Sequence, residues 1–275
     1  MMPSLATTPF NRFSKTLPLL KSDSLEVRLA QSEEEIKAAQ SLRYEVFYDE
    51  CGARPDENMA LLKRDVERID DFCDVLLVID RTYNKIVGTY RFMLRDAAQE
   101  YGSYYTATEF EIDKLVAYPG QIMELGRSCV RKEYRTKPTM QLLWRGIGAY
   151  IRLNQVTLCF GCGSFIGTDV SKYRQALAYL YHYHLASPEL RARALSSSYQ
   201  EMNLIPKNQV DQKEATRQLP PLIKGYLRLG GLVGEGAFVD HNFNSIDVCI
   251  IVKRETVTER YSQKYTDPRG SDEGV

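Results

Sequence analysis

Residues 122 to 130, Ile-Met-Glu-Leu-Gly-Arg-Ser-Cys-Val, form an apolar segment of strand length that carries two opposite charges around a glycine. Side chains three positions apart in a regular strand point to opposite faces of the sheet. Gly126 changes this expectation, because a glycine inside a strand often marks a bulge, and one extra residue would bring Glu124 and Arg127 to a common face as an ion pair. The alternative is an ordinary edge strand with two solvated charges.

The neighbouring segments predict a sheet with helices on both faces. Pro138 begins a helix that should end near Asn154, and residues 158–166 form a near-continuous apolar strand of the buried kind. A capping box, Ser32 followed by Glu35, opens a helix expected to reach about Asp49. Further strands are expected at 25–29, 75–79, 86–94 and 246–252, further helices at 170–185 and 221–229, and loops at 97–119. This order predicts an α/β (α+β) fold with a mixed central sheet.

Composition and charge describe a globular domain with two flexible ends. Residues 1–23 are rich in Ser, Thr and Pro and predict an arm, residues 24–254 the folded domain, and residues 255–275 a charged tail. The 36 Lys and Arg residues balance 36 Asp and Glu residues, which argues against a nucleic-acid partner. No apolar run approaches the roughly 18 residues of a membrane span, so we expect a cytoplasmic protein.

The cysteine pattern gives no support for a metal centre. Six cysteines lie in apolar surroundings, as expected for reduced, buried thiols in the cytosol. Cys159-Phe-Gly-Cys162 lacks a second ligand pair at zinc spacing, and His182 and His184 are only two positions apart. We therefore expect no metal.

Several short motifs carry a family resemblance. Arg43-Tyr-Glu-Val-Phe47, Asp70-Asp71, Gly88-Thr-Tyr-Arg91 and Glu124-Leu-Gly-Arg127 occur in the order and approximate spacing seen in acyl-homoserine-lactone synthases, a branch of the Gcn5-related N-acetyltransferase fold. The chain differs from that branch where it reads Tyr48-Asp-Glu-Cys51 in place of a tryptophan. Over residues 25–252 it resembles more closely the haemolysin-like L-ornithine N-alpha-acyltransferases, including the strings Leu-Leu-Trp-Arg-Gly-Ile at 142–147 and Leu-Pro-Pro-Leu-Ile-Lys-Gly-Tyr-Leu-Arg-Leu at 219–229.

The resemblance implies a reaction and its participants. A 3-hydroxyacyl chain would pass from acyl carrier protein to the α-amine of L-ornithine, giving lyso-ornithine lipid, the first step of ornithine lipid synthesis. The phosphopantetheine carried by the donor would insert between splayed strands at 122–130 and 158–166, with no tightly bound cofactor and with peripheral contact to the inner membrane. Two alternatives stay open: an enzyme like the lactone synthases or dependent on coenzyme A, and a non-catalytic protein that binds acyl carrier protein or lipid.

The proton that leaves the attacking amine needs an acceptor, because an amine attacks a thioester only when it is neutral. Glu124 is the candidate. Burial in an apolar cleft would raise the pKa of its carboxyl, whereas pairing with Arg127 would oppose that rise and leave Glu124 to orient the ammonium.

Ornithine carries one carboxylate and two amines, so its pocket needs charges of both signs. The resemblance and the bidentate geometry of guanidinium groups make Arg43, Arg91 and Arg127 candidates for the carboxylate. Candidates for the amines are the carboxylates of Asp70, Asp71 and Glu124. Asp240 and Asp247 flank a late strand and are either a further anion for the distal amine or ordinary turn and strand-end residues.

Positive charge follows the central strand, at Arg131, Lys132, Arg135 and Lys137. Backbone N–H groups at the start of the next helix can bind a phosphate. The turn Lys137-Pro-Thr-Met-Gln141 has no glycine-rich pyrophosphate loop, which fits a carrier-protein donor docked on the basic cluster. The alternative is a solvated helix face.

Overall fold

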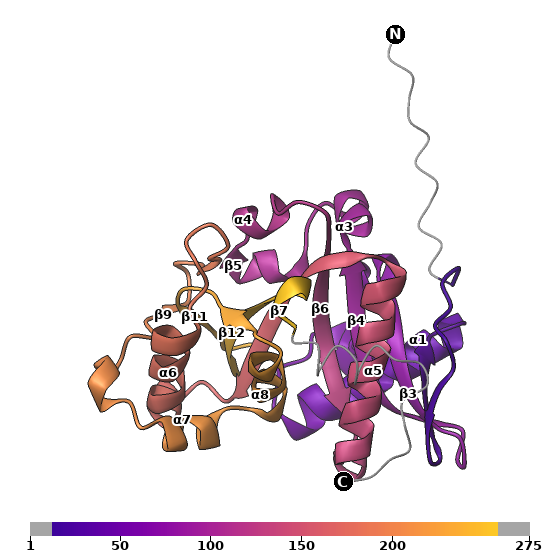
Figure 1. The fold of residues 1–275 in the computed structure, drawn as a ribbon. Helices are drawn as coiled ribbons and strands as arrows, with labels where there is room; N and C mark the ends of the chain where they lie inside the picture. Colours follow the sequence, from indigo (N-terminus) through magenta and orange to yellow (C-terminus); the bar gives the residue numbers. More distant parts are fainter. Residues whose placement is uncertain (1–12, 258–275) are drawn as a thin grey trace.

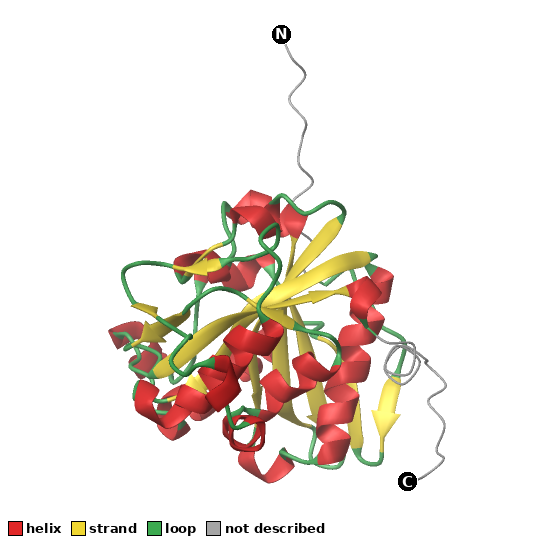
Figure 2. Cartoon of the chain, turned by 60° about the vertical axis from the view of Figure 1, so that its left-hand side comes forward, coloured by secondary structure: helices red, strands yellow, loops and turns green. Residues whose placement is uncertain are grey.

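The computed structural model describes residues 13–257, which build one large mixed sheet covered by helices (Figures 1 and 2). Neighbouring strands follow the order β1-β2-β3-β4-β6-β7-β12-β11-β9, and β10 also pairs with β12. Each of these pairs is antiparallel except β6 with β7, which is parallel. The strands of this sheet are β1 Leu20–Ser22, β2 Leu25–Leu29, β3 Asp74–Asp80, β4 Lys85–Leu94, β6 Gln121–Val130, β7 Val156–Ile166, β9 Tyr199–Gln200, β10 Leu232–Val233, β11 Ala237–Asp240 and β12 Ser245–Lys253.

The helices are short except for the one that follows β6. The α-helices are α1 Glu33–Tyr44, α2 Glu57–Leu62, α3 Arg95–Tyr101, α4 Asp113–Val116, α5 Lys137–Leu153, α6 Arg174–His184, α7 Gln212–Gln218 and α8 Pro221–Arg228. The chain adds a π-helix, η1 Glu45–Glu50, 3-10 turns that include η2 Arg68–Phe72 and η3 Tyr105–Thr108, and a two-stranded ribbon of β5 Phe110–Glu111 with β8 Arg193–Ala194. No helix among residues 13–257 is long and apolar enough to cross a membrane.

Each face of the sheet has its own hydrophobic core. On one face α5 packs Leu142, Trp144 and Ile147 into a cluster with Phe92 and Leu125, while α6 and α8 lie beside β12 (Figure 1). The opposite core contains Ile69 of η2, Met93 of β4, Ile122 of β6 and Phe160 of β7. Ile122 and Leu125 therefore face different cores, as the alternation of side chains along a strand requires. The predicted mixed sheet with helices on both faces is confirmed.

α5 shows why the sequence forms its longest helix at this point. Thr136 caps the helix by accepting a hydrogen bond from the backbone N–H of Thr139, and Pro138 lies in the first turn, where its missing N–H costs nothing. Residues 142–144 and 146–150 are all buried, so the middle of the helix is covered on nearly every side.

Two segments differ from the sequence-based expectation. The expected arm ends earlier than residue 23, because Leu20 is buried in β1 and the Lys15 ammonium lies 2.6 Å from Asp74. The segment 97–119, which was expected to be loop, contains most of α3 together with η3, β5 and α4. These elements are too short to show a clear helical or strand period in the sequence. The remaining parts of the expected arm and tail, residues 1–12 and 258–275, lie outside the described residues.

Candidate active site

β6 and β7 separate in the middle of the sheet. They pair in parallel from Gln121 to Glu124 of β6, against Val156 to Phe160 of β7, and no ladder pair joins the two strands beyond this point within the described residues. β7 continues to pair with β12 as far as Ile166. The splayed strands expected at 122–130 and 158–166 are therefore present, and a crevice opens between them.

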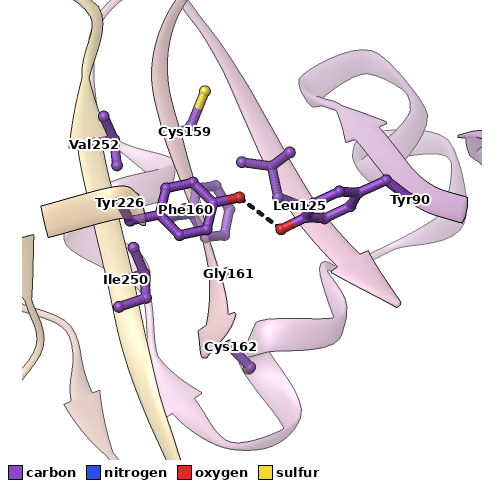
Figure 3. A pocket seen from close by; sticks show the side chains of 9 residues that line it. All are labelled: Tyr90, Leu125, Cys159, Phe160, Gly161, Cys162, Tyr226, Ile250 and Val252. Atoms are coloured by element: carbon purple, nitrogen blue, oxygen red, sulfur yellow. Dashed lines mark hydrogen bonds between the residues drawn. The ribbon is translucent and has the colours of Figure 1, made fainter. Parts of the chain in front are cut away.

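The crevice contains a narrow cavity lined by residues of five elements, β4, β6, β7, α8 and β12, and crossed by one hydrogen bond (Figure 3). The hydroxyl oxygens of Tyr90 on β4 and Tyr226 on α8 lie 2.6 Å apart across it. Burial raises the pKa of Tyr90 to about 12. The other lining residues are Leu125, Cys159, Phe160, Gly161, Cys162, Ile250 and Val252. The cavity is thus apolar apart from this pair of neutral hydroxyl groups.

Gly161 lies where the strands part, and its lack of a side chain lets the two backbones approach. A Cβ atom at this position would lie 2.1 Å from the carbonyl oxygen of Leu125. We expect Gly161→Ala to lower the free energy of unfolding by about 1–3 kcal/mol in a denaturant titration, because the strands must shift apart. Gly126→Ala is the matched control, since its Cβ would meet Arg91 only at an ordinary 3.8 Å. Equal stability of the two variants would contradict a tight crossing at Gly161.

β6 carries the expected bulge. Thr89 of β4 pairs with Cys129, and Arg91, two residues later, pairs with Gly126, so β6 holds one extra residue. The residue in the left-handed conformation is Arg127, with φ 53°, next to the glycine that signalled the bulge.

The bulge places Arg127 in a cage of rings and carboxylates. Its guanidinium lies 4.5 Å from the ring centroids of both Tyr105 and Phe243, and the side chain is 8% exposed. Its ion-pair partners are Glu67 at 2.8 Å and Asp65 at 3.2 Å. The expected ion pair with Glu124 is therefore replaced by two carboxylates from the segment before β3.

Glu124 is buried at the last pairing position before the crevice. Its carboxylate accepts hydrogen bonds from the backbone N–H groups of Tyr105 at 3.1 Å and Thr106 at 2.6 Å. Burial raises the pKa of this carboxyl, and the Thr106 hydrogen bonds and the charge of Arg91 only partly oppose that rise. Burial thus outweighs the neighbouring positive charges.

Three other predicted residues meet in a buried ion network. Arg43 of α1 donates to both oxygens of Asp70, at 3.0 and 2.6 Å, and lies 2.8 Å from Asp65. Arg91 lies 2.8 Å from Asp70 and 2.6 Å from Glu67. Burial alone would raise the pKa of Asp70, but the two guanidinium groups hold it well below its usual range. Arg43, Arg91 and Asp70 are at most 2% exposed.

The adjacent Asp71 is exposed, in contrast to Asp70. Asp65 and Glu67 complete the network and were not among the candidates predicted from the sequence. Both lie in a polar stretch without helical or strand periodicity, so no local signal distinguished them from solvated residues.

The basic cluster after β6 is partly neutralised. Arg131 forms an ion pair with Glu45, and Arg135 donates to both carboxylate oxygens of Glu50, so that η1 covers two of the four cations. Lys132 and Lys137 are exposed next to the start of α5.

A carboxylate cluster joins the residue that follows η3 to β11 and β12. Carboxylate oxygens of Glu109, Asp240 and Asp247 lie within 4.8 Å of one another. Glu109 was not a candidate from the sequence, because it follows η3 in the segment expected to be loop and meets β11 and β12 only through the tertiary fold.

The fold and the divided strands define the class of the protein. Residues 42–145 match the family model described as an acetyltransferase (GNAT) domain, so the chain has the Gcn5-related N-acetyltransferase fold. It is 43% identical over 249 residues to the L-ornithine N(alpha)-acyltransferase of Brucella abortus, covering 88% of this chain and 89% of that protein. The corresponding protein of Agrobacterium fabrum is 44% identical over 249 residues, covering 88% and 85%. The chain belongs to the L-ornithine N(alpha)-acyltransferase family.

Proposed function

We propose that this protein transfers a 3-hydroxyacyl chain from a thioester to the α-amine of L-ornithine, giving lyso-ornithine lipid. The observation that carries this proposal is the parting of β6 and β7 after Glu124 and Phe160, which lets an extended thioester arm pass between the strands. The residues that line the narrow cavity on one side are mostly apolar, which suits the thiol end of a pantetheine arm. The charged groups around Arg127 on the other side suit a zwitterionic acceptor.

In the proposed reaction, the neutral amine attacks the thioester carbonyl carbon, a C–N bond forms, and the C–S bond breaks to release a thiol. Glu124 takes the proton of the amine, directly or through one water, because its raised pKa makes it a stronger base than a solvated carboxylate. Tyr90 or Tyr226, whose hydroxyl groups face the cavity, gives a proton to the leaving sulfur, and the proton that Glu124 took from the amine returns through solvent to restore the tyrosine.

Arg127 binds the carboxylate of ornithine in this proposal, because it is the most accessible of the three candidate guanidinium groups. Arg43, Arg91 and Asp70 are positioning residues that fix the strand and the carboxylates around Arg127. Asp71 is exposed at the surface, and we assign it no contact with the acceptor.

Acyl carrier protein is the proposed donor, so that its phosphopantetheine supplies the thioester and no tightly bound cofactor is needed. The support is the absence of a glycine-rich pyrophosphate loop at Lys137-Pro-Thr-Met-Gln141, together with the exposed Lys132 and Lys137 at the start of α5. A carrier protein with an acidic surface would be steered to these cations. Arg131 and Arg135 would also contact the carrier protein if their ion pairs with Glu45 and Glu50 open.

Charge reversal tests the docking surface. The double variant Lys132→Glu, Lys137→Glu is expected to raise KM for the acyl carrier protein donor about threefold to tenfold, since each exposed ion pair is worth about 0.2–1 kcal/mol. The KM for a pantetheine thioester without the carrier protein should stay the same. The double variant Lys213→Glu on α7 and Lys224→Glu on α8, which lie away from the basic cluster in sequence, serves as control. An unchanged KM for the carrier-protein donor would place the docking surface elsewhere.

Peripheral association with the inner membrane is also proposed, because the product couples a polar headgroup to a long chain that partitions into lipid. Co-flotation of the purified protein with anionic vesicles tests this association. Recovery of all protein and all activity from the lipid-free fraction would count against it.

Thiol release tests the function as a whole. Purified protein supplied with a 3-hydroxyacyl carrier protein should release free thiol only when ornithine is present, in a one-to-one ratio with N-acylated product. Thiol release without an amine would indicate a thioesterase, and no release with any donor would favour a binding protein.

A further inference from the structure

The carboxylate cluster of Glu109, Asp240 and Asp247 takes no part in the transfer steps given above. Glu109 and Asp247 are each 3% exposed, and no Lys or Arg in the described part of the chain forms an ion pair with any of the three. Three carboxylates this close, two of them buried, repel one another unless protons or a cation reside among them.

The hydrogen bonds of the cluster leave one carboxylate oxygen without a donor. Asp240 accepts from the backbone N–H groups of Asn242 and Phe243, and Asp247 accepts from the Ser245 hydroxyl at 2.6 Å. The Oε2 atom of Glu109 is buried and has no hydrogen-bond partner. Burial and the nearby Asp247 raise the pKa of Glu109 to about 8. In the empty cluster this raised pKa keeps a proton on Glu109 at neutral pH. The unpartnered oxygen leaves room for a cationic donor, which would take the place of that proton when it binds.

The cluster adjoins the proposed carboxylate site at Arg127. Phe243, three residues after Asp240, covers the Arg127 guanidinium, and the positive charge of Arg127 acts to lower the pKa of Asp247. One site thus offers a guanidinium for a carboxylate and, next to it, acceptors for an ammonium group.

The reactivity of the two amines of the acceptor indicates which of them the carboxylate cluster binds. The α-amine must lose a proton to attack the thioester, and three carboxylates would hold it in the charged, unreactive form. The cluster suits an amine that stays protonated and does not react. An –NH₃⁺ group brings three donors, which matches the three carboxylates.

We propose that Glu109, Asp240 and Asp247 bind the side-chain ammonium of the diamino acid acceptor while its carboxylate lies at Arg127. This inference rests on the proposed function and adds to it the element that distinguishes a basic amino acid from a neutral one. It also accounts for transfer to the α-amine, because the cluster holds the competing amine charged.

Acceptor kinetics with two amino acids of equal chain length test the proposal. Ornithine is compared with 2-aminopentanoic acid, which lacks only the distal amine. Glu109→Gln and Asp247→Asn are each expected to raise KM for ornithine about tenfold to a hundredfold, as expected for loss of a buried charged hydrogen bond. KM for 2-aminopentanoic acid should change less than threefold. Glu111→Gln, an exposed neighbour on β5, is the matched control and should change neither value.

Measurements of thermal stability and of ornithine binding distinguish a failure of the ammonium site from a failure of the proposed acyltransferase function. The two cluster variants should unfold at the same or a higher temperature than the wild type, because each removes a repelling carboxylate. Calorimetric titration with ornithine, without donor, should show binding to the wild type and at least tenfold weaker binding to both variants. Binding of ornithine without formation of an acylated product would contradict the proposed function but would still support the ammonium site. Equal changes for both amino acids, unchanged ornithine binding, or activity lost to a chelator and restored by Mn²⁺ would overturn the ammonium site.

Discussion

Glu124→Gln is expected to lower kcat by about 10²–10⁴-fold, the range that general base catalysis commonly contributes. The amide has nearly the shape of the carboxylate but cannot accept the proton of the attacking amine. Steady-state kinetics with a saturating acyl donor measures the effect, and donor binding should be retained. Glu100→Gln, an exposed change on α3, serves as the control and should leave kcat within twofold of the wild type.

The pH dependence of kcat distinguishes a proton-accepting role of Glu124 from a purely structural one. The carboxylate holds the backbone of Tyr105 and Thr106, so the amide loses one of two hydrogen bonds and about 1–3 kcal/mol of stability. Because burial raises the pKa of Glu124, its basic form appears only as pH rises, and wild-type kcat should rise with pH through that pKa. The variant should regain rate only at higher pH, where the amine is already neutral. The same loss of rate at every pH would contradict the role of proton acceptor.

Asp70→Asn is expected to lower the free energy of unfolding by about 3–5 kcal/mol, because it leaves the buried guanidinium groups of Arg43 and Arg91 without their shared carboxylate. Urea titration monitored by circular dichroism measures the loss. Asp71→Asn is the matched control at the next residue. Since Asp71 is exposed, its replacement should change stability by less than about 0.5 kcal/mol.

The pH dependence of stability gives an independent check on the same network. The pKa of Asp70 is lowered in the folded state, so the unfolded chain binds more protons at acidic pH. The contribution of Asp70 is therefore fully present above its unfolded pKa of about 3.9 and is lost as pH falls below it. Stability of the Asp70→Asn variant should fall less steeply across that range. Parallel pH curves for wild type and variant would show that the ion network contributes nothing.

The sequence contained most of the scaffold of the site. The apolar runs predicted β3, β4, β6, β7 and β12 within about two residues, since buried strands carry long apolar segments. Gly126 signalled the bulge of β6, and the motif resemblance identified the divided strands. Arg43, Asp70 and Arg91, which the sequence offered as candidates for binding the substrate, lie together in a buried ion network.

Other parts of the site depend on contacts that no local pattern encodes. Glu109, Asp240 and Asp247 meet from separate segments, and only the fold shows that they share one cluster. The partners of Arg127 were equally hidden, because Asp65 and Glu67 lie in a polar stretch without periodicity. The ion pair between Glu124 and Arg127 was expected because the two residues are close in sequence. This expectation was wrong, because the bulge turns Arg127 toward Tyr105 and Phe243.

Tandem mass spectrometry of the reaction product shows whether this protein acylates the α-amine of ornithine. Purified protein is incubated with a 3-hydroxyacyl carrier protein and ornithine, and in parallel with the matching acyl-coenzyme A and with lysine or glutamine. We predict one product from the carrier-protein donor and ornithine, with fragments that place the acyl group on the α-nitrogen. No acylated amine under any pairing, or acylation at the side-chain nitrogen, would contradict the account.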